Sequence, residues 1–508
     1  MQLLLSAGLI LIIMAWGVVS PTSLGAFFDQ ALATITTNFG WLYLWVVLGL
    51  VIVAALLAFS RYGDLKLGDE DEEPEFSVAS WFAMLFAAGM GIGLVFWGVA
   101  EPISHYGAPP PGITANTPEA ANAAMRYSFF HWGLHPWAVY SVVALSIAFF
   151  SFRRGKPALI SSATEALPFT WAPKLTMIVN VLAVVATAFG VAASLGIGAL
   201  QINSGLHAVF GLKVGIASQL AIIAVTTVLF LTSALTGVSK GIKWLSTFNL
   251  IIAGLLALAV FTLGPTVVII DTFTNTLGSY LSEFVRMSLR MTPFRDSGWV
   301  SGWTVFYWAW WVSWSPFVGL FIARVSRGRT IREFILGTVL APTLAAFVWF
   351  SVFGGTALHL QIMQGLPIAE AVSADVSTGL FAMFDHLPMG GLMSGVATVL
   401  VLVFFVTSGD SATLVLGMMS TGGNENPSAR VKIVWGLLVS GIAISLLLAG
   451  GIKAVQTATI VFALPFTGVI LLLAIALWRG VRNDWNEEQR RERALRKRMR
   501  EMVDAPGR

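Results

Sequence analysis

The sequence contains no cysteine, and charged residues fill only 11% of its 508 positions. The lack of cysteine excludes disulfides, thiolate catalysis and metal sites that depend on cysteine ligands. The scarcity of charge excludes an ordinary soluble domain, in which roughly a quarter of the residues are charged. With 56% hydrophobic residues and 49 glycines, the composition is that of a polytopic membrane protein.

Recognisable catalytic motifs are also missing. The sequence shows no Ser-His-Asp, HExxH or paired-carboxylate arrangement, which disfavours an intramembrane enzyme. The net charge of +4 is spread over loops and a tail, without a folded basic domain to bind nucleic acid. We therefore expect neither an enzyme nor a nucleic-acid-binding protein.

Twelve apolar segments are each long enough to cross the hydrocarbon core, which takes about 20 helical residues. We expect an all-α polytopic fold with spans at 2–20, 41–60, 80–104, 124–151, 174–206, 215–236, 243–270, 302–323, 332–355, 390–416, 431–450 and 457–478. The first span lacks a preceding basic region and a second span follows soon, so we interpret it as a retained helix rather than a signal peptide. The loop at 271–301 contains the amphipathic stretch TLGSYLSEFVRMSLRM, which we expect to lie along the membrane surface.

The placement of lysine and arginine predicts the orientation. If the N-terminus is cytoplasmic, 24 of the 30 basic residues lie on the inner side and six on the outer side. The positive-inside rule then places both termini in the cytoplasm. The C-terminal stretch DWNEEQRRERALRKRMREMV is helical by composition. It is either a solvated orientation anchor or a regulatory arm that binds anionic lipid, and the two roles are compatible.

Three alternating glycines, Gly89, Gly91 and Gly93, interrupt an otherwise good helix in FAAGMGIGLVFWGVAEP. Each glycine costs about 1 kcal/mol relative to alanine in a helix. Unwound backbone at this depth must be buried or face a cavity, where its carbonyls can coordinate a cation. A close helix contact of the GxxxG kind is the alternative. Pro316 predicts a second break at the corresponding position of another half, and paired breaks of this kind indicate a transporter site.

Aromatic residues gather in two of the predicted spans. Residues 308–316 read WAWWVSWSP, although tryptophan in membrane helices is usually found at the water boundary. In HWGLHPWAVY, residues Trp132, Trp137 and Tyr140 share one arc of a helix. Such rings either pack in the core or form a cage. An aromatic cage without a carboxylate suits a quaternary ammonium group, which each ring face attracts by about 0.5–2 kcal/mol.

Few ionisable residues fall near the middle of a predicted span, namely Glu101, Asp410, His131 and His135. A membrane histidine is either hydrogen-bonded to a neighbour or part of a proton relay. Glu101 lies near the outer end of its span, where it has either a structural role or a role in transport.

The strings AAGMGIGLVFWGVAEPISHY, HWGLHPWAVY and FYWAWWVSWSPFVGLFIARVSRGRTIREF resemble the betaine/choline/carnitine transporter family. With VTSGDSATLVL at 406–416, the resemblance extends from the first span to the last. It implies twelve helices with an inverted five-plus-five repeat, as in other sodium symporters, and usually a homotrimer in the bacterial cytoplasmic membrane. The implied divisions are 1–60 (two additional helices), 61–79 (cytoplasmic loop), 80–270 (first half), 271–301 (outer connecting segment), 302–478 (second half) and 479–508 (basic cytoplasmic tail).

The resemblance also implies a substrate site and two sodium sites. The substrate site comprises an aromatic cage with its access path and backbone of the glycine run: Trp132, Trp137, Tyr140, Trp308, Trp310, Trp311, Trp314, Gly91 and Gly93. Within it, Trp311 is the expected direct cation–π contact. The first sodium site comprises carbonyls of Ala87, Met90 and Phe404 with hydroxyls of Thr407 and Ser408, although such hydroxyls often bond back to the i−4 carbonyl instead. The second comprises Thr187 and Phe317, where the chain departs from some members by having Val191 one turn after Thr187.

Gly93 bears on the choice of substrate, because proton-driven choline carriers of the family tend to have an acidic residue there. A neutral site suits a zwitterion, so the expected function is import of glycine betaine by symport with Na⁺, as an osmoprotectant. No cofactor is expected besides Na⁺ as the coupling ion. The alternatives are a proton- or sodium-coupled carrier of choline, carnitine, dimethylsulfoniopropionate or ectoine. An ion channel and a membrane enzyme or receptor are the rivals of other classes.

Overall fold

The computed structural model describes residues 2–89, 91–167, 169, 171–236, 239–294 and 298–504. Within these residues the chain is helical apart from turns and one isolated antiparallel bridge, which confirms the predicted all-α class. The helices of the first part are α1 (Gln2–Val19), α2 (Pro21–Phe59), α3 (Val78–Gly89), α4 (Ile92–Gly107), α5 (Pro118–Trp132), α6 (Leu134–Ala148), α7 (Thr176–Phe210), α8 (Ile216–Thr236) and α9 (Ser239–Leu263). Those of the second part are α10 (Thr266–Ser282), α11 (Phe284–Ser288), α12 (Gly298–Val300), α13 (Phe306–Arg324), α14 (Ile331–Met363), α15 (Ile368–Ala374), α16 (Gly379–Phe384), α17 (Gly390–Ser420) and α18 (Ala429–Asp504).

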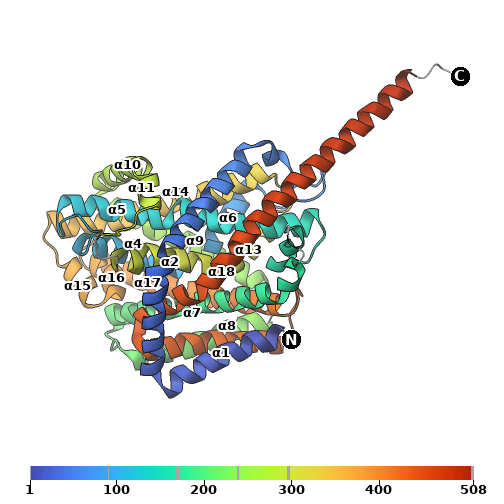
Figure 1. The fold of residues 1–508 in the computed structure, drawn as a ribbon. Coiled ribbons are helices and arrows are strands. Elements are labelled where there is room, and N and C mark those ends of the chain that lie inside the picture. The colour runs from blue at the N-terminus through green and yellow to red at the C-terminus, as the bar shows by residue number, and fades with distance from the viewer. Residues whose placement is uncertain are drawn as a thin grey trace.

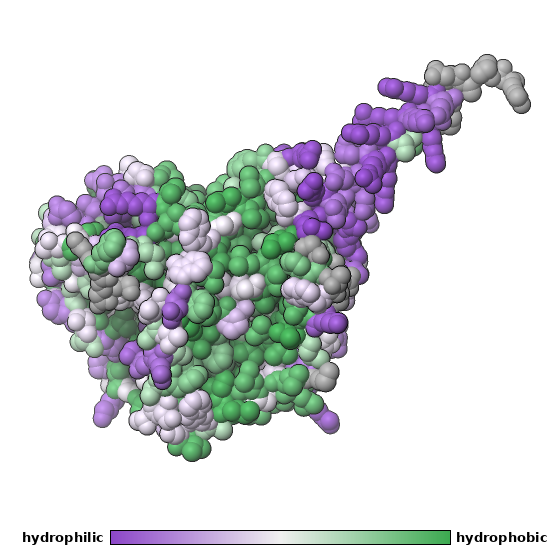
Figure 2. Space-filling view, in the orientation of Figure 1, coloured by the Kyte–Doolittle hydropathy of each residue, from purple (hydrophilic) through white to green (hydrophobic). Residues whose placement is uncertain are grey.

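In the described part of the chain, nine helices are long and apolar enough to cross a membrane, or ten if the bent pair α9–α10 forms one span. Hydrophobic side chains cover much of the face seen in Figure 2, whereas hydrophilic side chains gather on the projecting end of α18. Lipid tails are the solvent that suits such a surface. The chain is therefore a multi-pass membrane protein.

Several predicted spans are divided or joined differently in the structure. The spans at 431–450 and 457–478 both lie in α18, which is kinked at Gly450 and Gly451. Gly451 has a φ of 61°, in the left-handed region that glycine tolerates. The predicted amphipathic stretch, residues 276–291, forms the C-terminal part of α10 together with α11. The α10 helix is bent by 109° from the preceding helical segment 247–263. Its position along a membrane surface stays a prediction.

The predicted break in the glycine run is present. The helix α3 ends at Gly89 and α4 begins at Ile92, with Gly91 between them in an extended conformation (φ −134°, ψ −142°). Two helix ends therefore meet here, and their unpaired backbone groups are left for other partners. Met90, one of the predicted sodium ligands, lies outside the described residues.

The predicted break at Pro316 is wrong, because α13 continues through this residue. Proline has no N–H to bond the carbonyl of Val312, four residues earlier. The hydroxyl of Ser315 donates to that carbonyl instead, at 2.7 Å. A neighbouring serine thus satisfies the freed group and lets the helix persist. The irregular part of this segment is a π-helical turn, η5 (Ser301–Val305), which comes directly before α13.

The helices around α13 form the centre of the molecule. The helix α13 packs along α6, α7 and α18, while α17 and α18 both pack along α7. The helices α4 and α5 pack against each other and against α14. The end of α18 projects from this body (Figure 1). At its base, Arg153 is paired with Asp484 and Glu488, and Arg154 Nη2 lies 2.7 Å from Asp484 Oδ1.

Candidate functional site

Two helix interruptions lie on neighbouring segments, because α4 packs along α5. The first is the break between α3 and α4 described above. The second separates α5 from α6 at Gly133, which has a non-helical conformation. A Cβ at Gly133 would lie 2.5 Å from the carbonyl oxygen of Phe129 and 2.8 Å from Phe347 Cε1, so only glycine fits there. Trp132 consequently ends α5, and Trp137 and Tyr140 follow on α6. The prediction that all three share one arc of a single helix is therefore wrong, because the non-helical Gly133 breaks the helix between them.

The rings of five predicted site residues meet in one cluster, which we call the aromatic cage: Trp132, Trp137, Tyr140, Trp310 and Trp311. Trp132 meets Trp311 edge to face, with centroids 4.8 Å apart, and Trp310 at 6.1 Å. Trp310 and Trp311 are stacked at 5.1 Å. Tyr140 lies 6.0 Å from Trp311 and 5.5 Å from Trp137. All five side chains are buried, and they bring α5 and α6 together with α13.

Gly93, which the resemblance places in the substrate site, lies at the edge of the aromatic cage. A Cβ at this position would be 2.8 Å from Trp310 Cη2 and 3.0 Å from Trp132 Cη2. Both distances are below van der Waals contact, so the rings of two helices close over the backbone of α4 at this point. Gly91 differs, because a Cβ there would meet nothing within 4 Å.

The structure places Trp308 and Trp314 outside the aromatic cage. Trp308 stacks on His135 with centroids 5.2 Å apart and contacts Phe130 at 5.0 Å. Trp314 lies one turn beyond the cage and donates from Nε1 to the carbonyl oxygen of Gly190 on α7, at 2.8 Å. Of the four tryptophans in the WAWWVSWSP stretch, the middle two therefore form the cage wall.

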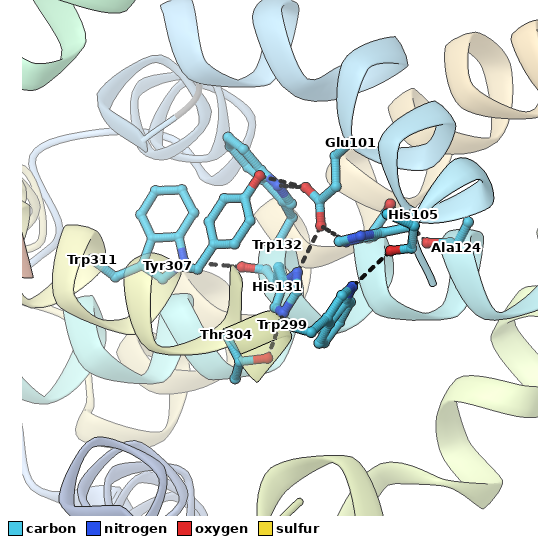
Figure 3. Close-up of polar contacts among 11 residues, drawn as sticks. Glu101, His105, Ala124, His131, Trp132, Trp299, Thr304, Tyr307 and Trp311 are labelled. Carbon is cyan, nitrogen blue, oxygen red and sulfur yellow. Dashed lines mark hydrogen bonds and ion pairs between the residues drawn. The ribbon is translucent and has the colours of Figure 1, made fainter. Parts of the chain in front are cut away.

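The buried carboxylate of Glu101 connects to the aromatic cage through hydrogen bonds (Figure 3). Its Oε2 accepts from Trp132 Nε1 at 2.8 Å and from the hydroxyl of Tyr307 at 2.5 Å. Its Oε1 lies 2.6 Å from His131 Nδ1 and 3.2 Å from His105 Nε2. His131 is thus hydrogen-bonded, one of its two predicted alternatives. Sequence reasoning missed Tyr307, and only its position one turn before Trp310 and Trp311 could have indicated it.

The residues of the second predicted sodium site lie on α7 and α13, which meet at Gly190. The hydroxyl of Thr187 on α7 is buried and has no hydrogen-bond partner among the described residues. Phe317 on α13 packs against Trp314, with centroids 5.2 Å apart. Val191 is fully buried and offers no oxygen. The orphaned hydroxyl oxygen of Thr187 suits a cation such as Na⁺, whereas the side chain of Val191 adds no further oxygen ligand.

The first predicted sodium site is described only in part. The hydroxyl of Thr407 donates to the carbonyl oxygen of Val403 at 2.9 Å, which is the back-bond alternative. This bond leaves the lone pairs of the hydroxyl available to a cation. Phe404 is buried and Ser408 half-buried on the same helix, α17. Ala87 lies in α3, where its side-chain surroundings are outside the described part, as is Met90.

The break in α3–α4 and the helix α17 nevertheless approach each other. A Cβ at Gly198 of α7 would lie 2.9 Å from both Ile92 Cδ1 and Phe405 Cδ2. These side chains come from the first residue of α4 and from the residue after Phe404. The first residue of α4 and the part of α17 next to Phe404 therefore converge on the same part of α7.

Comparison with known proteins identifies the family of the chain. Residues 2–486 match the family described as "BCCT, betaine/carnitine/choline family transporter". The chain is 49% identical over 481 residues to the glycine betaine transporter OpuD of Bacillus subtilis, covering 94% of this chain and 93% of that protein. It is 46% identical over 476 residues to the ectoine/hydroxyectoine transporter of Virgibacillus pantothenticus, covering 93% and 95%. It is 41% identical over 487 residues to a probable glycine betaine transporter of Desulfitobacterium hafniense, covering 95% and 97%.

Proposed function

The chain belongs to the betaine/carnitine/choline family of transporters, and on that premise we propose that it imports glycine betaine by symport with Na⁺. The observation that carries the proposal is the convergence of five aromatic rings in one cluster, two of which close over Gly93 next to a helix break. A trimethylammonium group cannot donate strong hydrogen bonds, but the faces of several rings attract it. The five cage side chains themselves carry no charge, and the carboxylate of Glu101 accepts hydrogen bonds from Trp132 Nε1 and the hydroxyl of Tyr307.

The other end of a zwitterion also has suitable partners in this region. Trp310 Nε1 is buried without a hydrogen-bond partner among the described residues, and the ring edge of Trp310 lies against Gly93. The first turn of α4 offers backbone N–H groups, and Gly91 before it provides no side-chain cap. Backbone N–H groups at a helix N-terminus favour an anion such as a carboxylate. Uncharged cage side chains, together with N–H groups that can donate hydrogen bonds to an anion, support a substrate that carries both a positive and a negative charge.

Coupling to Na⁺ would supply the energy for accumulation. A zwitterion has no net charge, so the membrane potential alone does not concentrate it. Each cotransported Na⁺ gains about 2.3 kcal/mol per 100 mV. The orphaned hydroxyl of Thr187 and the hydroxyl of Thr407 support two binding positions, with the remaining ligands as predicted from the sequence. The physiological result would be protection against osmotic stress.

The architecture that goes with this function is also a proposal. We infer twelve membrane helices, ten of them in an inverted repeat of two halves, with both termini in the cytoplasm. The protein would assemble as a homotrimer in the bacterial plasma membrane. The basic end of α18 would lie near anionic lipid, because each lysine or arginine near such a surface contributes about 1 kcal/mol of attraction.

Ectoine is the strongest alternative substrate, since the relative that transports ectoine and hydroxyectoine is 46% identical to this chain. Overall identity does not separate it from the glycine betaine transporter at 49%. Choline, carnitine and dimethylsulfoniopropionate are further candidates, because their onium groups suit the same rings. Coupling to protons is the alternative to coupling to Na⁺.

Uptake into proteoliposomes tests these choices. The purified protein should accumulate labelled glycine betaine against its gradient when Na⁺ is high outside, and should stop when K⁺ replaces Na⁺. Parallel assays with choline and ectoine rank the alternatives. Uptake that needs no Na⁺ would contradict sodium coupling, and equilibration without accumulation would favour a channel.

A further inference from the structure

The fully buried carboxylate of Glu101 joins side chains of three helices, α4, α5 and α13 (Figure 3). Trp132 and Tyr307 donate to one of its oxygens, and His131 and His105 face the other. We propose that Glu101 is a positioning residue, which holds both walls of the aromatic cage in the geometry that binds the solute. The inference deepens the proposed function and rests on it where a transported solute is the probe.

The first wall depends on Glu101 through Trp132. This residue ends α5 directly before the irregular Gly133, so the helix does not continue beyond it to fix the ring. The 2.8 Å hydrogen bond from Trp132 Nε1 to Glu101 Oε2 sets the plane of the indole instead. In that plane the ring meets Trp311 edge to face, at an interplanar angle of 76°. Loss of the acceptor would free Trp132 to turn about its side-chain bonds.

The second wall depends on Glu101 through Tyr307 and His131. Tyr307 precedes Trp311 by one turn on α13, and the two rings are stacked with centroids 5.9 Å apart. The hydroxyl of Tyr307 donates to Glu101 Oε2. The His131 ring lies between Glu101 and the hydroxyl of Thr304, 3.0 Å away, and its backbone carbonyl accepts from Trp311 Nε1 at 2.9 Å. One carboxylate therefore orients both the ring of Trp132 and the helix that carries Trp311.

The chemistry of the carboxylate suits this role better than that of an amide. A carboxylate can accept at both oxygens, so it satisfies four converging donors at once. A glutamine in its place has one accepting oxygen, and its NH₂ group would face donors on the other side. Replacement of Glu101 by glutamine thus preserves size, but Trp132 and Tyr307 keep their acceptor only if the NH₂ group faces the two histidines and both change tautomer to accept from it, and the charge of the acceptor is lost in every arrangement. Hydrogen bonds to an ionised acceptor are also shorter and stronger than neutral ones.

The test compares Glu101→Gln in two backgrounds, the natural chain and the double variant Trp132→Phe/Tyr307→Phe. The double variant already lacks the two donors to Glu101 Oε2, the indole of Trp132 and the hydroxyl of Tyr307. The dissociation constant of glycine betaine is measured on purified protein by calorimetry, and KM and maximal rate are measured in proteoliposomes. We expect Glu101→Gln to raise the dissociation constant at least tenfold in the natural chain and less than threefold in the double variant. The maximal rate should fall less than the affinity.

The matched control is His135→Gln. It breaks a buried hydrogen bond of similar length, from His135 Nε2 to Ser288 Oγ at 2.8 Å, outside the aromatic cage. It should lower the melting temperature without changing the affinity more than threefold. The inference is overturned if Glu101→Gln raises the dissociation constant by the same factor in both backgrounds. It is also overturned if Glu101→Gln and His135→Gln weaken binding equally in the natural chain, because Glu101 then has only a general structural role.

A readout without any solute separates this inference from the proposed function. In protein labelled with ¹⁵N-tryptophan, the indole N–H signals of Trp132 and Trp311 can be assigned from their loss in Trp132→Phe and Trp311→Phe. We expect both signals to move in Glu101→Gln, that of Trp132 toward the position of an unbonded indole, and neither to move in His135→Gln. Unchanged signals in Glu101→Gln would refute the positioning role. Absence of solute uptake by the natural protein would instead refute the proposed function, while the indole signals still decide the role of Glu101.

Discussion

Substitution of Gly93 by alanine tests the aromatic cage most directly. The added methyl would lie 2.8 Å from Trp310 Cη2 and 3.0 Å from Trp132 Cη2, whereas carbon atoms in ordinary contact are about 3.5–4.0 Å apart. The two rings must therefore move outward by roughly 0.5–1 Å, or α4 must move away from them. Overpacking of this kind costs about 1–3 kcal/mol. If this strain is present in the solute-bound state and relieved in the free state, the affinity for glycine betaine falls by about 5- to 150-fold, because 1.4 kcal/mol corresponds to a tenfold change in the dissociation constant.

The assay is uptake of labelled glycine betaine over a range of concentrations, with Gly98→Ala as the matched control. A methyl at Gly98 would lie 2.6 Å from Trp349 Nε1, so the same helix is pushed against an indole that lies outside the cage. Gly98→Ala should lower the melting temperature while KM stays within about twofold of that of the natural protein. A normal KM for Gly93→Ala would refute the reasoning, as would an equal rise in KM for both variants.

Three further predictions concern other contacts. Trp311→Ala should raise the KM for glycine betaine about 2- to 30-fold, which corresponds to the loss of one cation–π contact. Trp308→Phe, outside the cage, should leave this KM nearly unchanged. Equal effects of the two variants in uptake assays would contradict the assignment of Trp311 to the cage and of Trp308 to its surroundings. Thr187→Ala should raise the Na⁺ concentration that gives half-maximal uptake, and an unchanged Na⁺ dependence would exclude the second sodium site. Arg329→Ala removes a guanidinium whose Cζ lies 3.9 Å from the ring centroid of Trp81, together with the hydrogen bond that the guanidinium donates to the carbonyl oxygen of Phe76. The free energy of unfolding should therefore fall by about 1–3 kcal/mol. An unchanged melting temperature in detergent would contradict this prediction.

The break at the glycines could be predicted, whereas the continuity at Pro316 could not. Three glycines within five residues lower the helix propensity of the segment itself, and the structure has helix ends at Gly89 and Ile92. The effect of a proline depends on whether another group satisfies the carbonyl that it leaves free. Here the hydroxyl of Ser315 does so, through a rotamer that the sequence does not specify.

The composition of the aromatic cage was predictable in part. Helical spacing places Trp137 and Tyr140 near each other on α6. The break at Gly133 separates Trp132 from that helix, so its place in the cage does not follow from a shared helical arc. The pairing of these residues with Trp310 and Trp311, and the exclusion of Trp308, depend on how α13 is rotated against α5 and α6. Such rotation is set by tertiary packing, so the spacing of tryptophans along one helix could not distinguish the cage wall from its neighbours.

The hydrogen bonds of two indoles explain why positions 311 and 314, in the middle of this membrane helix, have tryptophan rather than phenylalanine. Trp311 donates to the carbonyl oxygen of His131 in the last turn of α5, and Trp314 donates to that of Gly190 on α7. Carbonyls in the last turn of a helix have no partner within the helix, and a buried indole N–H also needs an acceptor. The bond from Trp311 therefore satisfies two groups, and both bonds fix a ring face without placing a charge near the cage. A phenylalanine would fill similar space but would have no such tether. The position of these tryptophans far from the water boundary thus follows from the helix ends and neighbouring helices that they connect.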